Sequence, residues 1–128
     1  MDIRKTILLI DDEQEILDLY SAALIREGYD VITALDGMIG IALAKEKKPD
    51  LILLDLKMPG IDGVEVLSRL KNDPETSHLN IVFLTAFSDP QEIDVDAKFA
   101  KEMGATDFLK KGIGLDEFIK EIKKYFSA

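Results

Sequence analysis

The sequence alternates short, strongly apolar runs with longer segments of helical periodicity, and this alternation limits the fold more than any other feature. The apolar runs predict strands at Thr6–Asp11, Asp30–Ala34, Leu51–Asp55, Ile81–Thr85 and Asp107–Lys110. Three of these runs consist almost entirely of Ile, Leu, Val and Phe, which is typical of parallel strands covered on both faces. The segments between them carry apolar residues at helical spacing, which predicts helices within 16–24, 37–46, 64–72, 90–103 and 115–122.

Strict alternation of strand and helix indicates an α/β fold, in which right-handed crossovers place helices on both faces of a parallel sheet. The alternation does not determine the order of the strands.

Gly28 is a stop signal for the first helix. Asp89, Pro90 and Glu92 form a start signal for the helix within 90–103, as cap, first helical residue and capping-box partner. The acidic residues there are explained more simply by the helix macrodipole than by a metal site.

Length and composition predict one globular domain over residues 1–128. The chain is 47% hydrophobic and 32% charged, which is an ordinary globular balance. It has no cysteine, which excludes disulfides and thiolate metal sites and agrees with a reducing compartment. The early apolar run Ile7–Ile10 is far shorter than the roughly 18 residues that a spanning helix needs. We therefore expect a cytoplasmic protein without a membrane segment.

The charge balance argues against direct binding of nucleic acid. The formal net charge is −9, and a polyanionic ligand would need a strong local basic patch. The lysines of 45–48 are interrupted by Glu46, and Lys123 and Lys124 lie in the last predicted helix. Solvated lysine faces are the simpler interpretation of both groups.

Polar residues gather where the predicted strands end. The first strand runs into Asp11, Asp12 and Glu13, the third ends in Asp55, the fourth in Thr85, and the fifth runs into Lys110 and Lys111. Ligands of open parallel sheets bind at the carboxyl ends of the strands, so these side chains are expected to share one edge. A lone Asp at such a place is more often a turn former or a helix cap, and Asp12 could cap the first helix. The joint placement is what favours a functional site.

Carboxylates gathered at one edge require a cation or protonation. Two of them about 4 Å apart repel by about 4 kcal/mol at an effective dielectric near 20. Oxygen ligands without His or Cys point to Mg²⁺ or a similar hard cation rather than zinc. Such an ion can bring a phosphodonor up to a carboxylate nucleophile, while a lysine and a threonine hydroxyl hold the remaining phosphoryl oxygens.

Four segments closely resemble the response-regulator receiver domains of two-component signal transduction, the CheY-like family, and the resemblance covers essentially the whole chain. They are ILLIDDEQEI at 7–16, PDLILLDLKMPGIDGVEVL at 49–67, FLTA at 83–86 and GATDFLKK at 104–111. The second segment is highly specific, because the family shows an Asp followed by x-x-Met-Pro-x-x-Asp-Gly. The resemblance implies a flavodoxin-like three-layer (βα)5 sandwich, with a five-stranded parallel sheet in the order 2-1-3-4-5.

The resemblance also implies a phosphoacceptor and a metal site. Asp55 matches the residue that takes the phosphoryl group. Asp11, Asp12, Asp55 and the backbone carbonyl of Lys57 match the ligands of Mg²⁺, with Asp12 as a direct ligand and Asp11 acting through water. The function implied is a phosphorylated signalling switch rather than an enzyme acting on an external substrate. A histidine kinase or histidine phosphotransfer protein would donate the phosphoryl group, and a downstream effector protein would receive the signal.

Three further positions carry the family's switching and lysine roles. Thr85 matches the hydroxyl that binds the phosphate, and Phe108 matches the aromatic that turns inward in response. The family's lysine lies three residues after that aromatic, which selects Lys111 rather than Lys110. The family usually has a cis proline after the lysine, whereas this chain has Gly112. Because a cis bond before a non-proline residue costs about 2.5–4 kcal/mol, we expect a trans peptide and a loosened loop around Gly112 and Gly114.

Other interpretations remain in competition. A phosphatase of the haloacid dehalogenase type would need a Thr after its two acids, and the run Asp11–Glu15 lacks it. A flavodoxin-like cofactor binder would need a phosphate-cradling loop where the acidic residues 11–13 stand. A non-phosphorylated pseudo-receiver, serving as a protein-interaction scaffold, is the main alternative.

Two further expectations concern the surface. The stretch from Thr85 to Gly104 is about a helical turn longer than in chemotaxis-type members. His78 is expected to be a solvated loop residue.

Overall fold

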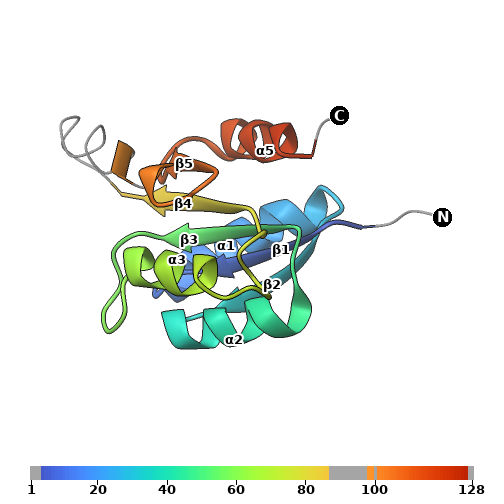
Figure 1. The fold of residues 1–128 in the computed structure, drawn as a ribbon. Coiled ribbons are helices and arrows are strands. Elements are labelled where there is room, and N and C mark those ends of the chain that lie inside the picture. Colours follow the sequence, from blue (N-terminus) through green and yellow to red (C-terminus); the bar gives the residue numbers. More distant parts are fainter. Residues whose placement is uncertain (1–3, 87–97, 100, 127–128) are drawn as a thin grey trace.

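The computed structural model describes residues 4–86, 98–99 and 101–126 and contains the five predicted strands in one parallel sheet. Its elements are β1 (Thr6–Ile10), α1 (Gln14–Arg26), β2 (Asp30–Ala34), α2 (Gly37–Lys47), β3 (Leu51–Asp55), α3 (Gly63–Lys71), β4 (Ile81–Thr85), β5 (Asp107–Lys110) and α5 (Leu115–Lys124). The strand order β2-β1-β3-β4-β5 confirms the expected fold class (Figure 1). The start signal at 89–92, most of the helix predicted within 90–103, and the extension before Gly104 lie outside the described residues.

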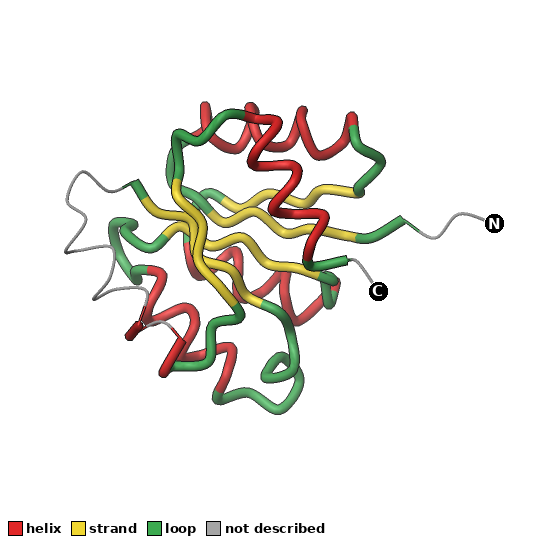
Figure 2. The backbone as a smooth tube through the Cα atoms, turned by 90° about the horizontal axis from the view of Figure 1, so that it is seen from above, coloured by secondary structure: helices red, strands yellow, loops and turns green. Residues whose placement is uncertain are grey.

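Two hydrophobic layers cover the sheet, and helices lie on both of its faces (Figure 2). Successive residues of a strand point to opposite faces, so the apolar runs supply both layers. In β3, Ile52 and Leu54 pack on the side of α2 and α3, whereas Leu51 and Leu53 pack on the side of α1 and α5. β3 and β4 are buried along their whole length. The near-continuous apolar runs are therefore explained by two-sided burial.

Local signals set the ends of several helices. Oδ1 of Asp36 accepts the Ile39 N–H at the start of α2. Gly28 adopts φ +100° just after α1, as its stop signal predicts, because this conformation is easy only for glycine. The suggestion that Asp12 caps α1 is wrong: Glu13 is the residue before the helix, and no side chain caps it. The Glu13 N–H instead donates to Oδ1 of Asp11 at 2.9 Å.

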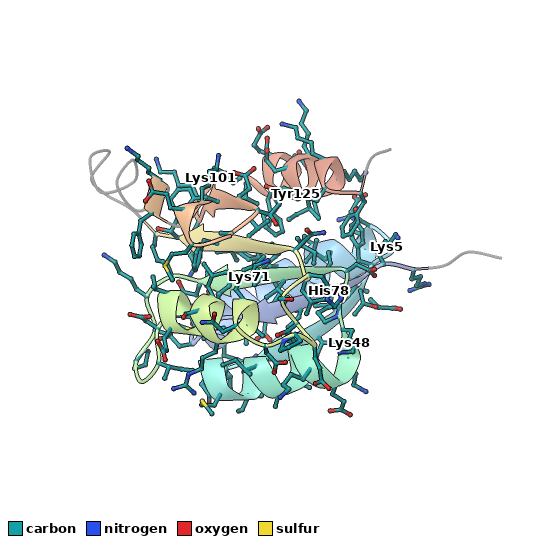
Figure 3. The ribbon with its side chains drawn as sticks, in the orientation of Figure 1. Lys5, Lys48, Lys71, His78, Lys101 and Tyr125 are labelled. Atoms are coloured by element: carbon teal, nitrogen blue, oxygen red, sulfur yellow. The ribbon has the colours of Figure 1, made fainter. Side chains whose placement is uncertain are left out.

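Two local predictions are confirmed: the exposed position of His78 and the trans peptide before Gly112. His78 is exposed, in the loop between α3 and β4 and away from the carboxyl ends of the strands (Figure 3). The peptide between Lys111 and Gly112 is trans, since no peptide bond in the described part of the chain is cis. None of the described helices has the length and hydrophobicity that crossing a membrane would require.

Candidate functional site

The carboxyl ends of β1, β3, β4 and β5 bring the predicted side chains to one edge of the sheet. Asp11 follows β1, Asp55 ends β3, Thr85 ends β4 and Lys111 follows β5. β1 and β3 are neighbours although β2 lies between them in sequence, so the edge includes the point where the strand order reverses. Ligand sites of open parallel sheets lie at such points. Asp11, Asp55 and Thr85 are all buried there.

Three carboxylates meet at this edge. Asp11, Asp12 and Asp55 each offer an oxygen, and among the described residues these oxygens lie within 4.8 Å of one another. Asp11 and Asp55 are only 1% and 4% exposed, whereas Asp12 is on the surface. Such close negative charges in a partly dry site repel strongly unless a cation or a proton is present.

The ammonium of Lys111 supplies part of the missing positive charge. Its Nζ lies 2.6 Å from Oδ2 of Asp11, 3.3 Å from Oδ1 of Asp55 and 3.8 Å from Oε1 of Glu13. The Lys111 side chain is only 7% exposed, whereas Lys110 lies on the surface. The structure therefore brings Lys111, and not its neighbour, to the carboxylates.

Burial and nearby charges shift the pKa values of Asp55 and Lys111. Burial and the nearby charge of Asp11 raise the pKa of Asp55 from 3.8 to about 7, although Lys111 opposes this rise. Burial disfavours the charged form of Lys111, but its hydrogen bond to Asp11 and the charge of Asp55 outweigh burial and raise the pKa of Lys111. In the absence of a metal ion, Asp55 is therefore half protonated near neutral pH.

The oxygens at this edge are suited to a hard cation. Oδ2 of Asp11 is buried, and its partner in the described structure is the ammonium of Lys111, 2.6 Å away. The cluster of three aspartates contains no His or Cys. Its ligand atoms are therefore the oxygens that Mg²⁺ prefers, rather than the nitrogen and sulfur ligands typical of zinc. Asp11, Asp12 and Asp55 could hold such an ion, and Lys57 lines a cavity together with Asp55.

A cavity of about 140 Å³ opens directly onto Asp55. Its lining comes from the ends of four strands and the following loops: Glu13, Asp55, Leu56, Lys57, Thr85, Ala86 and Lys111. This volume is well above the roughly 10–15 Å³ that one water needs, so a small group can enter beside the carboxylate. Phe108 does not line the cavity; it is half-buried in β5 and packs against the core on the α2 and α3 side.

Gly63 also shapes the site. It was not among the predicted site residues, although it is the Gly of the family's Asp-Gly pair. Its N–H donates to the Leu56 carbonyl at 2.9 Å. A Cβ at this position would overlap the carbonyl oxygen of Asp55 and lie 2.8 Å from Cα of Leu56. Oδ1 of Asp62 caps α3 by accepting the Glu65 N–H at 3.0 Å. The pair therefore seats the first turn of α3 directly against the backbone that presents Asp55.

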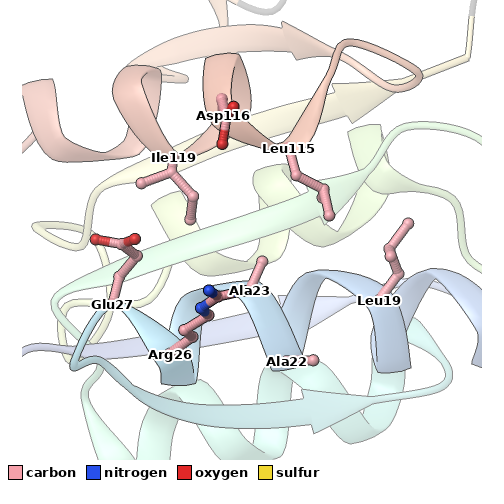
Figure 4. A pocket seen from close by; sticks show the side chains of 8 residues that line it. All are labelled: Leu19, Ala22, Ala23, Arg26, Glu27, Leu115, Asp116 and Ile119. Carbon is pink, nitrogen blue, oxygen red and sulfur yellow. The ribbon is translucent and has the colours of Figure 1, made fainter.

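A second hollow lies away from the carboxylates, between α1 and α5 (Figure 4). It measures about 400 Å³ and is lined by Leu19, Ala22, Ala23, Arg26, Glu27, Leu115, Asp116 and Ile119. None of the three clustered carboxylates lines this groove. The smaller cavity at the strand ends is therefore the candidate chemical site.

Comparisons with known proteins agree with this geometry. A family model described as response regulator receiver domain matches residues 7–123. The DNA-binding dual master transcriptional regulator RpaA of Synechocystis sp. is 40% identical over 117 residues, which are 91% of this chain and 47% of that protein. This chain thus spans about half the length of that relative. Sporulation initiation phosphotransferase F of Bacillus subtilis is 33% identical over 123 residues, covering 96% of this chain and 94% of the relative. The structure of chemotaxis protein CheY4 of Vibrio cholerae matches with a TM-score of 0.85 and 27% identity, over 96% of this chain and 99% of that one.

Proposed function

Because this chain belongs to the response regulator receiver domain family, we propose that it is a signalling switch that takes a phosphoryl group onto Asp55. One observation carries the assignment of the acceptor. Asp55 is a buried carboxylate that faces a small cavity, with two further carboxylates within 4.8 Å and the Lys111 ammonium 3.3 Å away. No other carboxylate of the described chain combines burial, a cationic partner and an opening to solvent in this way.

The proposed donor is the phosphohistidine of a histidine kinase or histidine phosphotransfer protein, or a small acyl phosphate. An oxygen of Asp55 attacks phosphorus in line; the new O–P bond forms as the donor's P–N or P–O bond breaks, and the leaving group keeps the electron pair. A Mg²⁺ ion held by Asp11, Asp12, Asp55 and the Lys57 backbone carbonyl would supply positive charge for the phosphoryl oxygens. The Lys111 ammonium lies beside both Asp11 and Asp55. It can therefore stabilise the negative charge of the phosphoryl group as that group is transferred to Asp55.

The proposed relay begins at Thr85, whose side chain lines the same cavity. Its hydroxyl donates to a phosphoryl oxygen and moves inward, and Phe108 turns into the space that becomes available. The ends of β4 and β5 are already joined, because the Lys111 N–H donates to the Thr85 carbonyl at 2.7 Å. A bias of a few kcal/mol between the two packings is enough to change which surface an effector protein binds.

The proposed switch is one receiver domain over residues 1–128, acting in the cytoplasm. Its partners are the phosphodonor protein and an effector protein, and we propose that it assists its own slow dephosphorylation without turning over an external substrate. DNA binding is named for the Synechocystis relative, of which this chain matches about half. We do not extend it to this chain, whose net charge of −9 disfavours a nucleic-acid contact.

Intact mass spectrometry after incubation with acetyl phosphate and Mg²⁺ tests the function. One added phosphoryl group is expected, and it should be absent after chelation and in Asp55→Asn. Asp18→Asn, which changes an exposed carboxylate of α1, is the matched control and should be phosphorylated normally. Absence of uptake from both acetyl phosphate and phosphohistidine donors, together with absence of Mg²⁺ binding, would instead support the pseudo-receiver scaffold.

A further inference from the structure

The ammonium of Lys111 has three carboxylate partners in the described part of the chain, and one of them lies outside the cluster of three aspartates. Its Nζ is 2.6 Å from Oδ2 of Asp11, 3.3 Å from Oδ1 of Asp55 and 3.8 Å from Oε1 of Glu13. Asp11 and Asp55 belong, with Asp12, to the oxygens that could hold a cation, whereas Glu13 does not. Glu13 is therefore the partner that a bound cation would leave to the lysine.

The two oxygens of Asp11 are engaged differently. Oδ1 accepts the Glu13 N–H at 2.9 Å. Oδ2 is buried and faces the Lys111 ammonium. A cation that uses Oδ2, directly or through a water, would meet the ammonium at the same oxygen, and two positive charges so close together repel strongly in a partly dry site. Binding of a cation therefore requires the ammonium to withdraw from Oδ2 of Asp11.

The backbone of Glu13 is held on both sides, which fixes the place from which its side chain leaves the chain. Its N–H donates to Asp11, and its carbonyl accepts two N–H groups from the first turn of α1. Its carboxylate does not cap that helix. The side chain instead lines the cavity that opens onto Asp55, and Lys111 lines the same cavity. The Glu13 carboxylate thus lies where a displaced ammonium can reach it.

We propose that Glu13 is a positioning residue for Lys111: its carboxylate receives the ammonium when Oδ2 of Asp11 turns to a cation, and so keeps the lysine beside Asp55. The ammonium then moves from a partner at 2.6 Å toward one that already lies 3.8 Å away. The Glu13 side chain is 61% exposed, so it is free to follow the ammonium, and the pair is correspondingly weak. This inference rests on the proposed function, because it concerns how Lys111 serves the transfer to Asp55.

Calorimetric titration with Mg²⁺ tests the inference by comparing Glu13→Gln with Glu15→Gln. Glu15 is the matched control, because it is an exposed glutamate at the same end of α1 and its replacement changes the net charge equally. Glu13→Gln is expected to weaken Mg²⁺ binding about two- to fivefold, the range of exposed ion pairs, because the displaced ammonium loses its remaining partner. Glu15→Gln is expected to leave the affinity nearly unchanged, because water and salt screen its charge.

A second background separates positioning of the lysine from simple attraction between Glu13 and the ion. In Lys111→Ala, Glu13→Gln should weaken Mg²⁺ binding no more than Glu15→Gln does, because the residue through which Glu13 acts is gone. Equal weakening with and without Lys111 would show that Glu13 acts on the ion through its charge alone, and would overturn the proposal. Unchanged Mg²⁺ affinity of Glu13→Gln would overturn it as well.

The NMR signal of the Lys111 ammonium reports its partner directly. In the protein saturated with Mg²⁺, Glu13→Gln should shift this signal, whereas Glu15→Gln should not; a signal insensitive to Glu13→Gln would refute the positioning role. Both readouts are independent of phosphorylation. Coupling between Glu13 and Lys111 without uptake of a phosphoryl group would refute the proposed function alone, and normal uptake without that coupling would refute this inference alone.

Discussion

Replacing Asp55 by Asn should stabilise the metal-free protein at alkaline pH and much less at acidic pH. Asn has nearly the same shape but carries no charge, so it removes the repulsion between positions 55 and 11. Lys111 keeps its 2.6 Å partner Asp11, so the change leaves no unpaired buried cation. The stabilisation is therefore a direct measure of what the ionised Asp55 costs in the folded state.

The magnitude follows from the pKa of Asp55, which burial and the charge of Asp11 raise from 3.8 to about 7. A carboxyl with a higher pKa in the folded than in the unfolded state makes the protein lose stability as pH rises from about 4 to about 7. At about 1.36 kcal/mol per pH unit, the loss between pH 5 and the folded-state pKa is about 3 kcal/mol. Asp55→Asn avoids this loss, so its advantage should grow by about 3 kcal/mol between pH 5 and pH 8.

Urea unfolding followed by circular dichroism, at several pH values and with a chelator present, measures this difference. Glu46→Gln, at an exposed carboxylate, should change the unfolding free energy by less than about 0.5 kcal/mol at every pH. Mg²⁺ added at pH 8 should stabilise the unchanged protein more than Asp55→Asn, because the ion binds where the charge is. An advantage of Asp55→Asn that stayed constant with pH, or a loss of stability at pH 8, would refute the reasoning.

Three further changes test separate parts of the site. Gly63→Ala should lower the unfolding free energy by about 1–3 kcal/mol in a urea titration, because its Cβ overlaps backbone atoms that cannot easily yield. Gly114→Ala, in open space, should cost less than about 1 kcal/mol. Lys111→Ala should slow phosphorylation of Asp55 about 100-fold in a mass-spectrometric time course, as removal of a charged stabilising group does. Thr85→Ala should still be phosphorylated, but the affinity of its effector protein should no longer respond to phosphorylation.

Each of these expectations can fail in its own way. Equal stability of the two alanine variants would show that α3 can move away from the acceptor strand at no cost. Rapid phosphorylation of Lys111→Ala would remove the lysine from the transfer step and leave it a structural counter-ion. Full coupling of phosphorylation to effector binding in Thr85→Ala would exclude the hydroxyl relay, without touching the assignment of Asp55.

The sequence alone determined most of the secondary structure, because its signals are local. Two-sided burial of a parallel strand requires a continuous apolar run, and β3 and β4 begin and end where those runs do. The first strand was one residue too long in the prediction, since Asp11 already belongs to the site edge rather than to β1. The strand order and the site roles came from the resemblance to receiver domains, because periodicity carries no information about which strands are neighbours.

Tertiary structure decided the features that depend on distance through space. Asp12 has the residue type of a helix cap, but the turn after β1 gives the Glu13 N–H to Asp11 instead. The raised pKa of Asp55 arises from burial and from Asp11, which is distant in sequence. The stacking of Tyr20 on Phe118 joins residues of α1 and α5 that are far apart in the sequence, and no local pattern around either residue predicts it. Local patterns can specify helices and strands. The protonation of a buried side chain and the contacts that hold it depend instead on which elements pack side by side.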